Sequence, residues 1–138
     1  MTHTARISVA TKGQGDAHDI TTQIAAAVRA SRLRSGVTTV FVVGSTAVIT
    51  TIEFEPGAVS DLNRVLESLA PRHGEYRHHE RWNDDNGSSH VRAALMGPSL
   101  AVPFTDGELV VGQWQQIVLL ECDTRARTRE VVIQVVGE

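Results

Sequence analysis

The C-terminal third of the chain restricts the fold most strongly, because nearly all of it has the composition of β-strands. Apolar and β-branched residues dominate the segments "SLAVPF", "ELVVGQWQQIVLLEC" and "REVVIQVVG". The first two segments flank Thr105-Asp106-Gly107, and Asp-Gly between apolar runs is the strongest short-range signal of a β-hairpin. This part of the chain therefore predicts a run of strands with antiparallel pairing.

The first half of the chain contains three more predicted strands. Ala5–Thr11 alternates apolar and polar residues, which is typical of a half-buried strand. Val37–Val43 and Ala47–Glu55 are rich in β-branched residues and are separated by Gly44-Ser45-Thr46. These three residues fit a tight turn, and their hydroxyl groups and flexible backbone also fit the close approach of a ligand.

Helices are predicted between these strands and before the C-terminal part. Asp19–Leu33 and Ser60–Ala70 carry apolar residues at the spacing of one helical face, with Asp19 and Ser60 as candidate N-caps. A short third helix, "HVRAALM", would be capped by Ser88 or Ser89. The order predicts an α+β fold, a single compact domain over residues 1–138 with a largely antiparallel sheet and three helices.

Composition narrows the class of protein. The formal net charge of −3 gives no general attraction to nucleic acid or to an anionic membrane. A single cysteine, Cys122, excludes an internal disulfide framework and fits a reducing compartment, and we expect it to be a buried, inert thiol. Neither a signal peptide nor a membrane span is recognisable. We expect a cytoplasmic protein.

Between Pro71 and Ser88 no periodicity is visible, and three of the six histidines lie in "YRHHERWNDDNGSSH". Loops of this length inside compact domains are uncommon and are often functional. Tyr76 and Trp82 favour burial, which indicates an ordered loop. A passive polar loop is the alternative.

Two kinds of site are compatible with this stretch. His78 and His90, with a carboxylate such as Glu53, Asp61, Asp84 or Asp85, could bind a divalent metal, and His79 would point away. Alternatively, Ser88, Ser89 and His90 at a helix N-terminus could bind an anion with help from Arg92. The histidines could also be ordinary surface residues.

Two other segments have both a structural and a functional interpretation. Glu53 and Glu55 share one face of a predicted strand, which is either an exposed face or a paired acid site. Trp114 precedes an apolar run and is predicted to lie in the core with its N–H bonded to backbone.

The ordered set of short motifs resembles the YjbQ-like family, in which many members are named secondary thiamine-phosphate synthase. The resemblance covers nearly the whole chain. It rests on Tyr76-x-His78, Asn86 to His90, Leu95-x-Gly97-Pro98-Ser99, Val102-Pro103 and Gly112-x-Trp114-Gln115.

The resemblance implies a compact α+β fold that forms a homotrimer with pockets near subunit boundaries. It also implies transfer of a pyrimidine from its pyrophosphate to a thiazole phosphate. The implied site residues are Glu53, Asp61, His78, Asn86 and His90. The alternative is a trimer that binds a small phosphorylated or anionic ligand without catalysis, and a purely structural trimer is a third hypothesis.

We therefore expect His78, Glu53 and Asp61 as catalytic residues, and Mg²⁺ or Zn²⁺ as a candidate cofactor held by His78 and His90. The expected ligand-binding residues are Ser45, Thr46, Asn86, Ser89 and Arg92. Many members of the family have histidine where this chain has Gly44, so a metal here would have one imidazole fewer.

Overall fold

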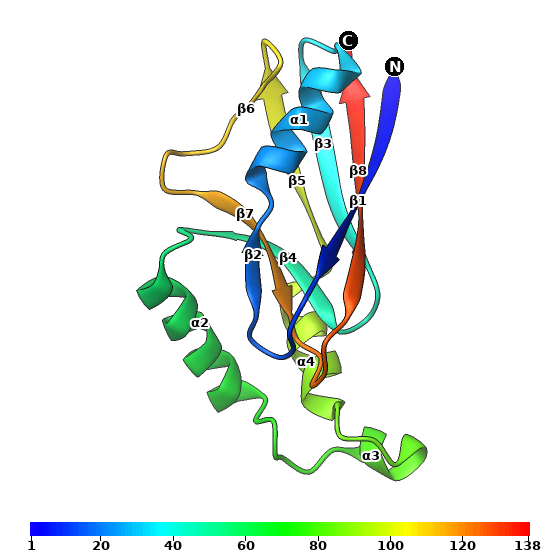
Figure 1. The fold of residues 1–138 in the computed structure, drawn as a ribbon, viewed down its shortest axis with the longest axis vertical. Helices are drawn as coiled ribbons and strands as arrows, with labels where there is room; N and C mark the ends of the chain where they lie inside the picture. Colours follow the sequence, from blue (N-terminus) through cyan, green and yellow to red (C-terminus); the bar gives the residue numbers. More distant parts are fainter.

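The computed structural model describes residues 1–138 and contains eight strands and four helices. In chain order these are β1 (Thr2–Ala10), β2 (Ala17–Asp19), α1 (Thr21–Ser31), β3 (Gly36–Val43), β4 (Ala47–Ile52), α2 (Pro56–Leu69), α3 (Arg77–Trp82), α4 (Gly87–Met96), β5 (Ser99–Thr105), β6 (Glu108–Leu109), β7 (Gln116–Glu121) and β8 (Thr128–Gly137). Figure 1 shows both termini at the same end of the molecule. The predicted α+β fold is confirmed, with one helix more than predicted.

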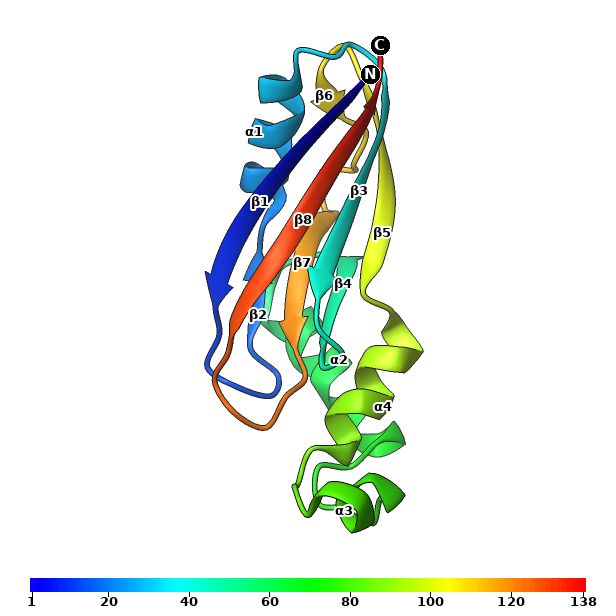
Figure 2. The same ribbon diagram turned by 90° about the vertical axis from the view of Figure 1, so that its right-hand side faces the viewer.

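Two antiparallel sheets form the body of the protein. Five strands follow the order β1-β8-β3-β5-β6, and three strands follow the order β2-β7-β4. Figure 2 shows β1, β8, β3 and β5 side by side in the larger sheet. Because Val43 at the end of β3 lies opposite Glu130 of β8, the turn that follows β3 lies beside the beginning of β8.

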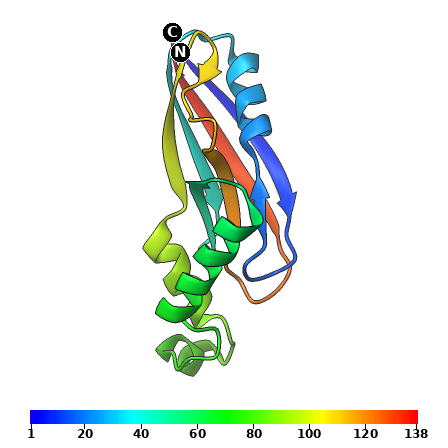
Figure 3. The same cartoon turned by 90° about the vertical axis from the view of Figure 1, so that its left-hand side faces the viewer.

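The three-stranded sheet is buried on both faces. On one face, Ile49 and Leu119 pack into the main core with α1 and the larger sheet. On the other face, Leu120 packs with Leu66 of α2 and Ala93 of α4, and Figure 3 shows α2 lying across this side of the molecule. Strands that are covered on both faces are apolar almost throughout, which explains the run Ile117–Leu120.

The predicted Asp-Gly hairpin joins β5 to β6. Asp106 and Gly107 have φ angles of 52° and 77°, as a two-residue turn with the twist of the flanking strands requires. After β6 the chain leaves the larger sheet and crosses to β7 in the smaller one. The predicted continuous strand is therefore interrupted, and the prediction of a core position for Trp114 is wrong, because its exposed fraction is 68%.

Three helix predictions need correction. The second helix begins at Pro56 instead of Ser60, because Glu55 accepts hydrogen bonds from the backbone N–H groups of Gly57 and Ala58. The short helix near the histidines begins after Asn86, so Ser88 and Ser89 lie within its first turn and do not cap it. Part of the expected loop is the additional helix α3, and Trp82 at its end is exposed.

None of the four helices is both long enough and apolar enough to cross a bilayer.

Helix α2 is held to the body by one fully buried side chain, Leu66. We expect Leu66→Ala to lower the free energy of unfolding by about 2–5 kcal/mol, because the change removes buried methyl groups and leaves a cavity. The exposed Leu69 on the same helix is the control, and Leu69→Ala should change stability by less than about 0.5 kcal/mol. Urea denaturation measures both. Equal stability of the two variants would contradict this role for Leu66.

Candidate functional site

The segment from Tyr76 to Gly87 folds into a hairpin-like turn that brings α3 against the beginning of α4. Tyr76 anchors its start, because the phenolic hydroxyl donates a 2.6 Å hydrogen bond to the carbonyl of Pro71. Helix α3 ends at Asn83, whose φ of 51° is left-handed and reverses the chain. The turn therefore places His78 on α3 near residues of α4.

His79 supports this turn instead of facing the site expected at His78 and His90. Its Nε2 atom accepts a 2.9 Å hydrogen bond from the N–H of Gly87. Its ring packs edge-to-face against Tyr76, with 5.4 Å between the ring centroids. Gly87 is required here, because a Cβ atom at this position would lie 2.4 Å from the Cβ of Tyr76.

His78, Asp84 and Asn86 form a polar cluster at the entry to α4. The Nε2 atom of His78 lies 3.0 Å from the Asn86 amide and 3.3 Å from Oδ1 of Asp84. The amide satisfies its neighbours when its nitrogen faces them, because it then donates to His78 and to both carboxylate oxygens of Asp84. With the amide reversed, the oxygen of Asn86 would lie beside the His78 nitrogen and the Asp84 carboxylate. Acceptor atoms grouped in this way can bind a cation.

His90 completes the cluster from the first turns of α4. Its ring lies 4.4 Å from that of His78, centroid to centroid. Partial burial lowers the pKa of His90, and the neighbouring His78 lowers it further, while Asp123 and Asp84 act in the opposite direction. At neutral pH the imidazole of His90 is therefore neutral and can accept a proton or bind a metal.

The beginning of α4 carries an unusual amount of buried polar surface. Asn86, Ser88 and Ser89 are all buried. The hydroxyl of Ser88 accepts a 3.2 Å hydrogen bond from the Gln14 side chain. The hydroxyl of Ser89 has no partner within the protein. Such a group is costly unless something else bonds to it.

A pocket of about 370 Å³ opens beside His90. Its walls come from the turn between β3 and β4 and from α4, with Gly44, Ser45 and Ala94 among them. The pocket thus joins two segments that the sequence analysis had singled out separately, the Gly-Ser-Thr turn and the helix that carries His90.

A buried network of charged side chains contacts the turn between β3 and β4. Arg129 of β8 binds Glu121 of β7 through Nε at 2.8 Å, and the same guanidinium donates to the hydroxyl of Thr46 at 2.7 Å. Thr46 in turn donates to Asp123 at 3.0 Å, and Arg127 binds the same carboxylate. Burial by itself would raise the pKa of Asp123, but these hydrogen bonds outweigh it and lower the pKa.

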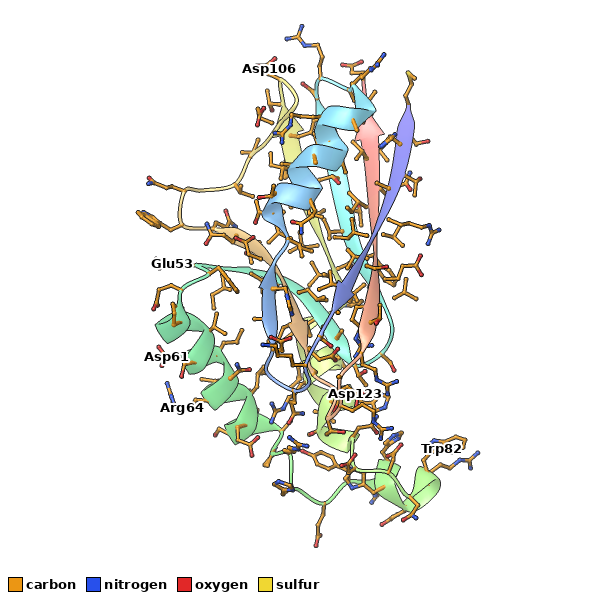
Figure 4. All side chains as sticks on the ribbon, in the orientation of Figure 1. Glu53, Asp61, Arg64, Trp82, Asp106 and Asp123 are labelled. Atoms are coloured by element: carbon orange, nitrogen blue, oxygen red, sulfur yellow. The ribbon has the colours of Figure 1, made fainter.

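The structure brings some of the expected site residues together and separates others. His78, Asn86 and His90 are close to one another, and Ser45 lies on the same pocket as His90. Glu53 and Asp61 are exposed beside α2, away from α3 and its exposed Trp82, as Figure 4 shows. Within one chain they do not join the histidine cluster.

Two expected ligand-binding residues are occupied by structural contacts. Arg92 donates to the backbone carbonyl of Ala70 at 2.9 Å and pairs with Glu67, so it ties α4 to the end of α2. Thr46 is buried in the network around Arg129 and Asp123.

The metal hypothesis fits the residues only in part. No three His, Cys, Asp or Glu side chains converge in a way that could hold a metal ion by themselves. His78 and Asp84 supply one nitrogen and one carboxylate, and the Asn86 amide could add an oxygen. The remaining positions on a metal would have to come from a ligand, from water or from another subunit, which suits Mg²⁺ bound through substrate phosphates.

Cys122 takes no part in this site. It is buried in the smaller core cluster, and burial raises its pKa to about 12. The expectation of a buried thiol is confirmed, and a raised pKa disfavours the reactive thiolate.

Sequence reasoning missed Glu121 and Arg129, which hold the Gly-Ser-Thr turn in place. The signal was present in Glu121, a charged residue that directly follows the fully buried run Ile117–Leu120. A buried carboxylate requires a buried partner, but that partner could be identified only from the pairing of the strands.

Comparison with known proteins gives consistent results over the whole chain. Residues 5–138 match the family model described as "UPF0047 protein YjbQ-like". A UPF0047 protein of Methanothermobacter thermautotrophicus is 32% identical over 99% of this chain and 93% of its own length. A UPF0047 protein of Synechocystis is 32% identical over 99% and 92% of the two chains.

Solved structures show the same fold. A hypothetical protein of Aeropyrum pernix superposes with a TM-score of 0.89 at 27% identity and covers 99% of both chains. A conserved hypothetical protein of Thermus thermophilus superposes with a TM-score of 0.80 at 32% identity, covering 96% of this chain and 99% of its own.

Proposed function

Since this chain belongs to the UPF0047 YjbQ-like family, we propose that it binds a small phosphorylated molecule in the pocket between α4 and the β3–β4 turn. The observation that carries the proposal is the arrangement around His90. The imidazole of His90 borders the pocket, packs against the ring of His78 and lies in the first half of the ten-residue helix α4.

The pocket favours an anion for two reasons. The positive end of the α4 dipole attracts phosphate, while the N–H groups of Gly87, Ser89 and His90 are bonded within the protein. The second reason is Ser45, which lines the pocket and carries a hydroxyl group that can donate to a phosphate oxygen.

A divalent cation would reconcile a phosphate with the nearby carboxylates. His78, Asp84 and the oxygen of a reversed Asn86 amide would hold it, and the phosphate oxygens of the ligand would complete its coordination. Mg²⁺ is the favoured ion because phosphates bind it well, whereas Zn²⁺ would use the imidazoles of His78 and His90. When bound, the cation supplies positive charge to the phosphate groups.

Transfer with release of pyrophosphate, as in a thiamine-phosphate synthase, is the second candidate function. His90 borders the space where a departing pyrophosphate would lie, and the cation and the helix dipole would neutralise the charge on that group. His78 would orient the ligand through its contacts with Asn86 and Asp84. Glu53 and Asp61 could take part only from a neighbouring subunit.

We also propose a homotrimer. The outer face of the larger sheet carries a row of exposed apolar side chains, namely Val37, Phe41, Val43 and Val136, and an apolar face of this kind favours association with other chains. Light scattering of the wild-type protein should give three times the 15.0 kDa of one chain. A mass of one chain would refute the trimer.

Thermal unfolding tests ligand binding. Pyrophosphate with Mg²⁺ should raise the Tm of the wild-type protein by about 5 °C or more, because a ligand that binds only the folded state stabilises it. Sodium sulfate at the same ionic strength is the control for a general salt effect. An unchanged Tm at millimolar pyrophosphate would contradict the proposed function.

Turnover tests the second candidate. Purified protein with the pyrimidine pyrophosphate, the thiazole phosphate and Mg²⁺ should release pyrophosphate and thiamine phosphate. His78→Ala should abolish this release, while His73→Ala, which changes an exposed histidine outside the cluster, should retain it. Binding of pyrophosphate without turnover would leave the protein as a binding protein.

A further inference from the structure

We propose that Arg129 donates a hydrogen bond to a phosphate oxygen of the ligand through the gap left by Gly44, which makes Arg129 a specificity-determining residue. The inference rests on the proposed function, because it takes the pocket beside His90 as the ligand site. It adds a donor that belongs to neither α3 nor α4.

Arg129 is almost fully buried, and its hydrogen bonds leave one nitrogen unused. Its exposed fraction is 6%. Nε and Nη2 donate to Glu121, and Nη2 also donates to the backbone carbonyl and hydroxyl of Thr46 at 3.1 and 2.7 Å. A guanidinium has five N–H groups. Those on Nη1 have no partner in the protein, and Nη1 is not among the fully buried atoms that lack a partner, so an acceptor from outside the protein can reach it.

The free Nη1 lies next to the backbone of Gly44. A Cβ atom at position 44 would lie 2.8 Å from Nη1, which is too close for a carbon atom, so a side chain here would press against the guanidinium. The φ angle of Gly44 is 135°, a conformation that residues with side chains rarely adopt. Because Gly44 has no side chain, it leaves Nη1 uncovered on this side of the turn, and an oxygen atom of a ligand can approach it.

The same glycine lines the pocket. Gly44 and Ser45 form one wall of the space that His90 borders from α4. A phosphate in this pocket could therefore direct one oxygen past Gly44 while its other oxygens face Ser45 and His90. The residues on both sides of the pocket would then contact a single tetrahedral group.

The charges around Arg129 allow this contact. Glu121 is engaged with Arg129, with the hydroxyl of Thr11 at 2.7 Å and with the N–H of Asp123 at 2.9 Å. The carboxylate of Asp123 is paired with Arg127. Both buried carboxylates thus have cationic partners, and the Nη1 end of Arg129 is left as the donor at the turn.

A crystal structure of the wild-type protein with magnesium pyrophosphate tests the inference directly. We expect a phosphate oxygen about 3 Å from Nη1 of Arg129. Pyrophosphate bound beside His90 with only water at Nη1 would overturn the inference and leave the proposed function intact. Failure of the wild-type protein to bind pyrophosphate would overturn both.

Gly44→Ala provides a second test. The added methyl group would press against Nη1 and block the approach of the proposed oxygen, so the affinity for magnesium pyrophosphate should fall about tenfold or more. Gly112→Ala is the matched control, because a Cβ there meets nothing closer than 3.7 Å and should leave the affinity unchanged. A folded Gly44→Ala protein with wild-type affinity would overturn the inference. If this variant does not fold, the structure of the wild-type complex decides.

Discussion

Replacing Glu121 by glutamine should lower the free energy of unfolding by about 3–5 kcal/mol, the largest stability loss we expect from one substitution outside the apolar core. Glu121 is fully buried and pairs with Arg129. The variant leaves a buried guanidinium without its counter-charge, and an uncompensated buried charge is strongly destabilising. Urea denaturation of the purified variant measures the loss.

Two further variants distinguish the effect of the buried charge from other effects of changing these side chains. Glu121→Leu combined with Arg129→Met removes both charges, and we expect it to recover much of the stability lost by Glu121→Gln. Glu130→Gln changes the exposed carboxylate that pairs with Arg6, and its effect should stay below about 1 kcal/mol. If Glu121→Gln were as stable as Glu130→Gln, the buried network would not hold the β3–β4 turn in place.

Replacing His90 by alanine should weaken the binding of magnesium pyrophosphate at least about tenfold. His90 borders the pocket and packs against the ring of His78. The variant therefore removes one wall of the ligand site and the partner that positions the second imidazole. His73→Ala, which changes an exposed histidine, should bind as the wild type does. Equal affinities of the two variants would remove His90 from the site.

The pH dependence separates binding with a metal from binding of a free anion. Because the pKa of His90 is lowered below the ordinary 6.5, the imidazole is neutral at pH 7 and takes up a proton only as the pH falls below 6.5. A proton on His90 would place positive charge beside His78, a proposed ligand of the cation, so binding through a cation should weaken in this range. A metal-free phosphate would instead bind more tightly to an imidazolium.

The free energy of unfolding should also depend on the protonation of His90. Between the lowered pKa of His90 and 6.5, the unfolded chain binds more protons than the folded one. As far as His90 determines it, the free energy of unfolding is therefore highest above pH 6.5 and decreases as the pH falls through this range. His90→Ala should reduce this slope.

Much of the fold could be predicted from the sequence, because its signals are local. The Asp106-Gly107 hairpin depends on two adjacent residues, and the apolar run Ile117–Leu120 indicates a buried strand. The errors had physical causes as well. Helix α3 has only six residues and buries none of them, so it produces no apolar stripe. Trp114 is exposed because its segment crosses between the sheets, which no local pattern reports.

The candidate site was predicted only in part, for a similar reason. His78, Asn86 and His90 are close in sequence, and the reversal of the chain at Asn83 was enough to bring them together. The contact between Gly44 and Arg129 joins residues from two strands whose pairing could not be known beforehand. Glu53 and Asp61, which the family resemblance implied as site residues, lie away from the histidine cluster within one chain.

Isothermal titration of the wild-type protein with pyrophosphate, with and without Mg²⁺, tests the proposed function most directly. We expect saturable binding in the presence of Mg²⁺, at one site per chain and with a Kd below about 1 mM, which corresponds to about −4 kcal/mol. Binding should be much weaker when EDTA removes the metal. Heats no larger than those of dilution, with Mg²⁺ present and pyrophosphate at several millimolar, would contradict a phosphate site beside His90.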